Sequence, residues 1–335
     1  MLRMVRFIIR QCKLMVCHFF YDISYMVKNR EKIVSKIRNN DVNTIFICDI
    51  NFFIKNKWQV ASQSKLWHKF VEDNDLLLCG SSLSYFIYGR YFKNIVSLEV
   101  YYNAPKINFL SHHDRIVMFI SDSHSKKWLP KHIKNANITD ILTPYKKTLQ
   151  YTGFCGDLDT ENIHSFPWCV TTEDMRDVHI KSNNNNVLSF GKIGSEVYDL
   201  REWAFNTGEL VAYDYAGSGN KKYSGNAFYQ WLRSFDACVV AMSSMKIYNY
   251  TVAKYFEVPS QGLLLFAFPS DDFSELGFID NYNCIYVNKD NFYDKINEFK
   301  NSPEKYIEIR KNGFDFIRNN HTDLCRIDYL NKIIN

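Results

Sequence analysis

Short, almost purely apolar runs recur along this chain and alternate with segments of helical character. The run LLLFAF at 263–268 is the clearest, and it follows a polar segment that contains glutamate, proline and glycine. Continuous apolar runs of about four to eight residues are typical of strands buried on both faces, as in parallel sheets connected by helices. The alternation therefore predicts an α/β chain built on doubly wound parallel sheets.

The expected strands form two series. They are the runs at 44–50, 75–80, 94–102, 115–122 and 140–144, and then those at 187–191, 209–217, 236–243, 262–268 and 284–288. Between the series, TTEDMRDVHIKSNNNN at 171–186 is polar and ends in four asparagines, as expected of a linker. Two similar Rossmann-like halves are predicted, with a cleft between them.

The chain of 335 residues is long enough for two domains of ordinary size. We expect an N-terminal amphipathic helical extension at 1–40 and a first Rossmann-like domain at 41–172. A second Rossmann-like domain is expected at 173–312, followed by a C-terminal helix at 313–335 that crosses back.

The N-terminal extension is apolar and basic. Arg3, Arg6, Arg10 and Lys13 recur every three or four residues, which on a helix gathers them on one face. Charges interrupt the segment too often for a membrane-spanning helix. Two interpretations remain open: residues 1–30 contact a membrane surface peripherally, or the helix simply covers the domain that follows.

Charge and cysteine content restrict the class of protein. A formal net charge of +5 is too weak to indicate nucleic-acid binding, although it suits a phosphorylated small molecule. Nine cysteines are scattered without a CxxC pair, so neither a zinc site nor a disulfide framework is expected. This usage indicates a reducing compartment and a cytoplasmic protein, with membrane association open.

The polar segment before LLLFAF has the signals of a helix. Asn249 or Thr251 can cap its start through a side-chain oxygen, and Gly262 suits the left-handed turn that ends a helix. Pro259 should kink or shorten the last turn. A helix from about Asn249 is therefore expected to lead into the strand.

Helical spacing places Tyr250, Lys254, Glu257 and Gln261 on one face of that helix. In a doubly wound sheet such a helix follows the carboxyl end of a strand, where ligands bind. Its N-terminus and Lys254 would attract an anion, and Glu257 could accept hydrogen bonds from a ribose diol. This pattern suits a nucleotide diphosphate, but a solvated face with an ordinary Lys–Glu pair has the same pattern.

Three segments resemble one enzyme family. KYFEVPSQGLLLF at 254–266 and FKNSPEKYIEIRKNGFDFIRNNHTDLCR at 299–326 resemble the C-terminal half of group-1 glycosyltransferases, in particular the spore-maturation-type branch. VLSFGKIGSEVYDLRE at 187–202 is similar to the same branch. The resemblance covers roughly residues 185–335, and the N-terminal half follows only by pattern. It implies the two-domain GT-B fold, no required metal, and a nucleotide-sugar donor. It also implies that the domain at 41–172 holds the acceptor and the domain at 173–312 holds the donor.

The resemblance assigns donor-binding roles to individual positions. Glu257 matches the glutamate that holds the donor ribose, and Gly191 matches the glycine of the loop that closes on the diphosphate. Arg201 matches an arginine near that loop, and Lys254 stands where the branch often has a basic residue. Tyr250 and Thr251, at the expected start of the helix, complete the donor-binding set.

Two of these positions leave alternatives open. Arg201 could contact phosphate, or it could pair with Glu202 or Asp199 as a structural element. Tyr250 occupies the position, seven residues before Glu257, where retaining enzymes of the family commonly have a second acidic residue. This departure puts the retaining mechanism in doubt.

An inverting reaction would need a general base for the acceptor hydroxyl. Asp122 and His124 in FISDSHSKKW come just after an expected buried strand, so they are the catalytic candidates, although either could cap the next helix instead. Tyr145 and the segment 166–168 could stack an acceptor sugar, or could be core or hinge packing.

Departure of a nucleotide diphosphate leaves negative charge that must be stabilised. Some enzymes use a metal held by Asp-x-Asp, whereas a GT-B enzyme uses backbone N–H groups, helix ends and basic side chains. DLD at 157–159 has the Asp-x-Asp spacing but precedes the linker, so no metal and no cofactor besides the nucleotide-sugar co-substrate are expected.

The sequence thus predicts a metal-independent glycosyltransferase that moves a hexosyl or pentosyl group from a nucleotide-diphosphate donor to a hydroxyl. The acceptor would be a glycan, a lipid-linked molecule or a protein, and no nucleic-acid partner is expected. Two alternatives remain: a nucleotide-sugar epimerase of the same fold, and a GT-B-like binding subunit without catalysis.

Overall fold

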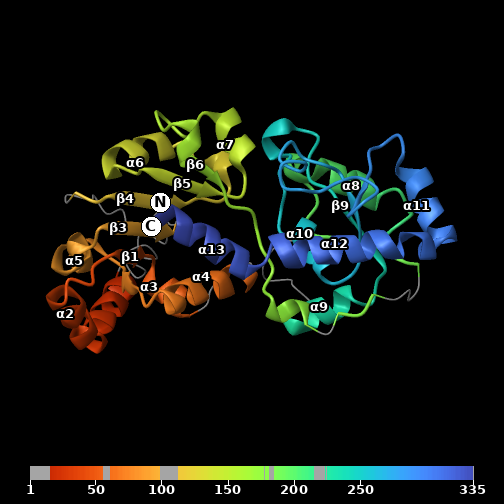
Figure 1. Cartoon of the computed structure of the whole chain (residues 1–335). Helices are drawn as coiled ribbons and strands as arrows, with labels where there is room; N and C mark the ends of the chain where they lie inside the picture. The colour runs from red at the N-terminus through yellow and green to blue at the C-terminus, as the bar shows by residue number, and fades with distance from the viewer. Residues whose placement is uncertain are drawn as a thin grey trace, which may run out of the picture.

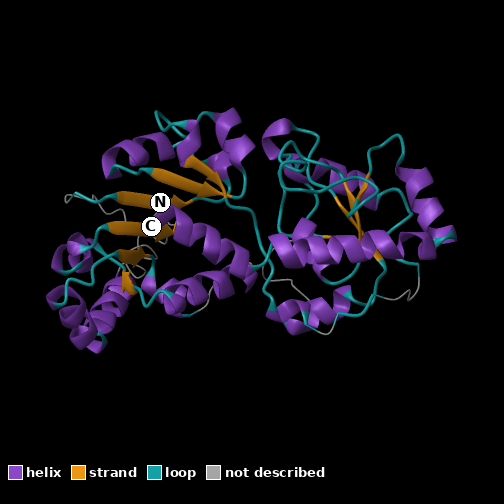
Figure 2. Cartoon of the chain, in the orientation of Figure 1, coloured by secondary structure: helices purple, strands orange, loops and turns teal. Residues whose placement is uncertain are grey.

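The computed structural model of the chain describes residues 16–55, 61–98, 112–176, 178–180, 185–214, 223 and 225–334. Two separate groups of strands, each accompanied by helices, lie side by side (Figure 2). In Figure 1 the first group lies at the left and the second at the right, and these groups are called the first and second domains below.

The first domain contains a six-stranded sheet in the order β2-β1-β3-β4-β5-β6. Its strands are β1 (Thr44–Ile47), β2 (Leu77–Cys79), β3 (Asn94–Leu98), β4 (Arg115–Phe119), β5 (Asp140–Thr143) and β6 (Ile163–Ser165). All the pairings between them are parallel. The short, partly polar β6 was not predicted.

The second domain contains a five-stranded sheet in the order β11-β10-β9-β7-β8. Its strands are β7 (Val187–Phe190), β8 (Val211–Tyr213), β9 (Ala237–Val240), β10 (Leu264–Ala267) and β11 (Ile285–Tyr286), again paired in parallel. From β7 the chain continues to β8 on one side and then to β9 on the other side of β7. The boundary between β7 and β9 is therefore the topological switch point of the sheet.

Helices connect the strands and cover the sheets (Figure 1). In the first half of the chain they are α2 (Arg30–Arg38), α3 (Ile50–Ile54), α4 (Ala61–Asp73), α5 (Ser82–Ile87), α6 (Leu129–Ala136) and α7 (Lys146–Thr152). In the second half they are α8 (Asp199–Phe205), α9 (Asn226–Leu232), α10 (Lys254–Ser260), α11 (Phe292–Asn301), α12 (Ile307–Asn320) and α13 (Asp323–Ile334).

Both faces of most strands are buried, with β6 and β8 as exceptions, which explains the continuous apolar runs. In β1, Ile45 and Ile47 belong to one core cluster and Phe46 to another on the opposite face. In β10, Leu265 and Leu264 divide in the same way between two clusters of the second domain. Because successive side chains of a strand point to opposite faces, a doubly covered strand must be apolar at every position. The predicted doubly wound architecture is confirmed.

The C-terminal helix crosses back to the first domain, as predicted. α12 lies in the second domain and α13 in the first (Figure 1). Leu330 of α13 belongs to a core cluster of the first domain, and the Ile334 carbonyl accepts a hydrogen bond of 3.0 Å from Asn94 Nδ2. The predicted boundary at 313 lies inside α12, which ends at Asn320. The chain crosses to the first domain after this helix, at residues 321–322.

The two segments that connect the domains run side by side, and Val170 of one forms a parallel bridge with Thr322 of the other. This region is called the hinge below. His321 donates from Nε2 to the Leu276 carbonyl of the second domain at 3.0 Å, and its Nδ1 accepts from Arg326 at 2.5 Å. Burial lowers the pKa of His321 to about 3, so the ring is neutral and can accept. His321, Thr322 and Arg326, at the end of the segment 299–326 that carries the family resemblance, are therefore residues of the crossing between the domains.

A helix over residues 16–28 covers one end of the first domain. Its His18 is within 3.1 Å of Asp49, and Tyr25 accepts a hydrogen bond of 2.9 Å from Leu78 N. This part of the extension is thus packed on the following domain through its inward face. The basic positions between Arg3 and Lys13 lie outside the described residues. Within the described ranges, no helix combines the length and hydropathy needed to cross a membrane.

Candidate functional site

The site is centred on the carboxyl end of β7, at the switch point of the second sheet. Gly191 follows β7 directly and has φ +122°, a backbone conformation that side-chain-bearing residues rarely adopt. A Cβ at this position would overlap Lys254 Nζ and lie 3.0 Å from Arg201 Nη1. Two cationic groups thus lie directly beside a residue that has no side chain to shield them.

Lys254 is the first residue of α10. Its ammonium donates to the Phe190 carbonyl at 2.7 Å and lies 4.7 Å from the centroid of the Phe190 ring. These contacts hold the charge at the end of β7 rather than letting it extend into solvent.

Arg201 of α8 is buried, and the structure places it as a support of the loop after β7. It donates to the Lys192 carbonyl at 2.9 Å and to the Ala241 carbonyl, just beyond β9, at 3.2 Å. The loop is also held by Glu202, which accepts from Gly194 N at 3.2 Å. The guanidinium therefore joins the ends of β7 and β9, and its charge remains next to Gly191.

Glu257 follows Lys254 by three residues in α10 and is half-buried. Its charge reaches the same interior region as the two cations. Burial raises the pKa of the Cys238 thiol, Lys254 and Arg201 act to lower that pKa, and Glu257 acts to raise it. Glu257 also raises the pKa of Tyr229 in α9, after the larger effect of burial. The distances thus bring Gly191, Arg201 and Lys254 together, and the charge of Glu257 acts on the same buried thiol as the two cations.

The expected helix start at Asn249 is wrong. α10 begins at Lys254, and its N-cap residue, Ala253, makes no side-chain cap. The Thr251 hydroxyl instead hydrogen-bonds the Ser270 hydroxyl at 2.7 Å in the interior. Tyr250 precedes the helix, so it is not on a helical stripe with Lys254 and Glu257.

Tyr250 is buried and faces the first domain. Its ring centroid lies 4.2 Å from that of Tyr145 and 5.6 Å from that of His124, with only 11° between the planes of the latter pair. Tyr145 accepts a hydrogen bond of 2.8 Å from Trp168 Nε1. Tyr145 and Trp168 are therefore packed at the domain junction, which was one of the two interpretations left open by the sequence.

His124 and Asp122 follow β4 in the first domain. Burial lowers the pKa of His124, with Asp122 acting to raise it and Lys126 to lower it further. His124 Nδ1 is buried and has no hydrogen-bond partner among the described residues. Asp122 has φ +47°, a turn conformation that Asp tolerates better than most residues, and its carbonyl accepts from Ser125 N at 3.1 Å.

A cluster of contacts between the two domains was not predicted. Asp272 accepts from Lys147 N at 3.3 Å, and Lys147 Nζ lies 2.7 Å from Glu275. Tyr151 of α7 donates to Asp271. These acidic residues lie in a loop of the second domain, and neither charge spacing nor periodicity marks them as partners of α7.

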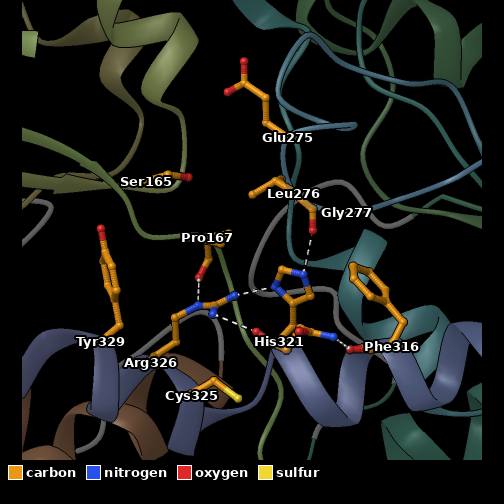
Figure 3. Close-up of a pocket in the computed structure, with 11 residues that line it drawn as sticks. Ser165, Pro167, Glu275, Leu276, Gly277, Phe316, His321, Cys325, Arg326 and Tyr329 are labelled. Carbon is orange, nitrogen blue, oxygen red and sulfur yellow. Dashed lines mark hydrogen bonds between the residues drawn. The ribbon is translucent and has the colours of Figure 1, made fainter. Parts of the chain in front are cut away.

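A cavity of about 380 Å³ opens at the hinge and contains none of the predicted donor-site residues (Figure 3). Arg326 and His321 line it, and both are engaged in hydrogen bonds with the protein itself. The cavity is thus a feature of the hinge rather than part of the cluster around Gly191.

Solved structures share this architecture. Anabaena Alr3699/HepE in complex with UDP and glucose matches over 88% of this chain and 99% of its own, with a TM-score of 0.55 and 10% identity. The same protein in complex with UDP-glucose gives a TM-score of 0.56 at 10% identity, over 87% of this chain and 99% of its own. A glycosyltransferase from Rickettsia africae ESF-5 matches over 87% and 97%, with a TM-score of 0.53 and 10% identity.

The chain has the GT-B fold. No protein-family model and no curated protein sequence matches it, so the spore-maturation-type branch stays a prediction. Among the described residues, no group of His, Cys, Asp and Glu has the arrangement of a metal site, and both aspartates of the DLD segment at 157–159 are exposed.

Proposed function

We propose that this chain is a glycosyltransferase that moves a sugar from a nucleotide diphosphate to the hydroxyl of an acceptor. The observation that carries the proposal is the placement of the Lys254 and Arg201 cations beside Gly191, at the switch point of the second sheet. Ligands of doubly wound sheets bind outside the carboxyl ends of strands at this point. Alr3699/HepE, which has a similar fold, was solved with UDP-glucose.

The chemistry of the cluster suits the leaving group. Cleavage of the anomeric C–O bond leaves negative charge on the nucleotide diphosphate, and preorganised cations stabilise that charge best where water is limited. Gly191 leaves room for phosphate oxygens near Lys254, while Arg201 holds the loop and adds a second positive charge. We propose that these side chains, without a metal or other cofactor, supply the stabilisation.

Glu257 would fix the nucleoside portion. A carboxylate one turn into α10 can accept two hydrogen bonds from vicinal hydroxyls, as in a ribose. His124, with Asp122 beside it, would accept the proton of the acceptor hydroxyl, since a neutral imidazole is competent as a base near pH 7. The acceptor would then be held by the first domain and the donor by the second.

Calorimetry tests donor binding first. UDP, GDP and TDP are titrated with and without EDTA, and at least one should bind with a dissociation constant of about 1 mM or lower in both conditions. Glu257→Ala should abolish this binding without changing the unfolding temperature. Glu304→Ala, at an exposed glutamate of the same domain, is the matched control and should bind as the unmodified chain does.

Transfer is then assayed with hexose and pentose donors of the nucleotide that binds. Product formation on a glycan, lipid-linked or peptide hydroxyl would support the proposal. Conversion of the nucleotide sugar without any acceptor would identify an epimerase instead. Binding without turnover across the panel would indicate a non-catalytic subunit, and normal binding by Glu257→Ala would remove the site assignment.

A further inference from the structure

Helix 16–28 turns several of its polar groups toward the protein. The Asp22 carboxylate accepts from Gly80 N at 3.1 Å and from the Ser81 hydroxyl, and it is fully buried. His18 and Tyr25, on the same side, contact Asp49 just after β1 and Leu78 within β2. The inward face of this helix is therefore held by hydrogen bonds as well as by packing against the core.

The outward face carries an apolar stripe. Val16, Phe20 and Val27 are 54%, 65% and 71% exposed, and Phe19 beside them is 46% exposed. Spacings of four and seven residues place the first three on one side of a helix. This stripe is additional to the apolar side chains of Tyr21, Tyr25 and Met26, which pack against the core. An ordinary surface helix presents mainly polar residues on its outward face. An exposed stripe of this kind indicates that something apolar covers it.

Positive charge is concentrated in the same part of the chain. Residues 1–38 contain nine Lys or Arg and two acidic residues, a net charge of +7, whereas the whole chain has +5. The remaining residues are thus slightly acidic. Lys28 and Arg30, at the end of the stripe, are both exposed. A basic segment next to exposed aliphatic and aromatic side chains is the combination that binds anionic bilayers.

We infer that helix 16–28 docks on an anionic membrane surface, with Val16, Phe20 and Val27 entering the interface and the exposed Lys28 and Arg30 contacting lipid phosphates. A second copy of this chain is the less favourable occupant, because it would bring two segments of charge +7 together. The helix would lie in the plane of the interface rather than span it. This inference does not depend on the proposed glycosyl transfer.

Vesicle flotation with the full chain tests the inference. The protein should float with phosphatidylcholine vesicles that contain phosphatidylglycerol, and much less with phosphatidylcholine alone. Salt at about 0.5 M should reduce binding, since it screens the phosphate contacts. Phe20→Glu and Val27→Glu should each lower the partition coefficient about tenfold or more, because each removes an apolar side chain from the interface and adds a repelled charge.

Ile279→Glu is the matched control, since Ile279 is 55% exposed but belongs to the second domain. It should partition as the unmodified chain does, and circular dichroism should show all variants folded. Equal partitioning of Phe20→Glu and the control, or no flotation of the unmodified chain, would overturn the inference. So would self-association in sedimentation that disappears in Phe20→Glu, because a second copy would then cover the stripe.

Discussion

The imidazole of His124 stacks on the phenol ring of Tyr250 across the two domains, with 5.6 Å between ring centroids and 11° between planes. His124 belongs to the first domain, and Tyr250 leads into α10, which carries Lys254 and Glu257. The stack therefore connects the candidate base with the candidate donor site. Tyr250 occupies the position where the resemblance to group-1 glycosyltransferases predicts an acidic residue, and it makes a ring contact there instead.

His124→Ala should lower kcat by about 10² to 10⁴ with little change in donor affinity, since the base acts only in the chemical step. Burial holds the pKa of His124 below its ordinary value of 6.5. Activity needs the neutral ring, so the rate should stay level at neutral pH and fall only as the pH drops below about 6.5. Steady-state kinetics across pH, with donor affinity measured separately, check both expectations.

Tyr250→Phe is the control for this prediction. It keeps the ring against His124 and should retain most of the activity, whereas Tyr250→Ala removes the stacking surface and should reduce kcat. If His124→Ala retained the full rate, His124 would not be the base and Asp122→Asn would become the informative variant.

Gly191→Ala should weaken donor binding at least about tenfold. The methyl group would overlap Lys254 Nζ, and φ +122° is unfavourable for alanine, so the loop or the lysine must move. Gly208→Ala is a matched control, because Gly208 also has positive φ but a Cβ there meets no atom within 4 Å. Calorimetric titration with the bound nucleotide, alongside thermal unfolding, separates lost affinity from simple backbone strain, which both variants share.

The sequence predicted the strands well because burial on both faces leaves an unmistakable apolar run, as in Leu264–Ala267. It missed β6, in which only Ile163 is fully buried and His164 and Ser165 are partly exposed, so no apolar run exists. The sequence could place three residues in one site before the structure was known, namely Gly191, Arg201 and Lys254. Each lies at the end of a parallel strand or near the start of the next helix, and such ends meet at one edge of a sheet.

Tertiary contacts explain the features that the sequence did not reveal. Thr251 has the residue type of a helix cap, but its hydroxyl is used by Ser270, a residue that only the fold brings near. Similarly, the contact of Tyr250 with His124 and that of Asp272 with Lys147 depend on how the two domains meet. Neither helical nor strand periodicity carries information about that arrangement.

Asp272→Asn should stabilise the protein at neutral pH. Burial raises the pKa of Asp272 from 3.8 to about 6, although Lys147 N opposes the shift. Since the folded state favours the protonated form, the ionised carboxyl is destabilising above about pH 6, and the penalty is relieved as the pH falls from about 6 to 3.8. Asparagine keeps an acceptor for Lys147 N, so the gain at pH 7.5 should be about 1–3 kcal/mol.

Urea unfolding at pH 7.5 and near pH 4 measures this effect, and the gain should be absent at the lower pH. Asp271→Asn is the control, because Asp271 accepts from Tyr151 and lies 3.7 Å from Lys246 at the surface. It should leave stability unchanged or slightly lower at either pH. A lower stability of Asp272→Asn at pH 7.5 would show that the charge itself is needed at the domain junction.

His18 should make the attachment of helix 16–28 dependent on pH. The hydrogen bond to Asp49 raises the pKa of His18 above 6.5, against the opposing effect of burial. The stabilisation is therefore fully present below about pH 6.5 and is lost as the pH rises through the folded-state pKa. Burial acts to raise the pKa of Asp49, but the hydrogen bond from His18 leaves it net lowered, so both partners are charged in mildly acidic solution.

His18→Gln should therefore cost about 1 kcal/mol of unfolding free energy near pH 6, after allowance for solvent screening, and less at higher pH. Asp49→Asn should abolish the same pH dependence while keeping the acceptor that caps α3 through Phe52 N at 3.0 Å. Urea unfolding of both variants and of the double variant at several pH values checks the pairing. Additive costs in the double variant would show that the two side chains stabilise the helix independently of each other.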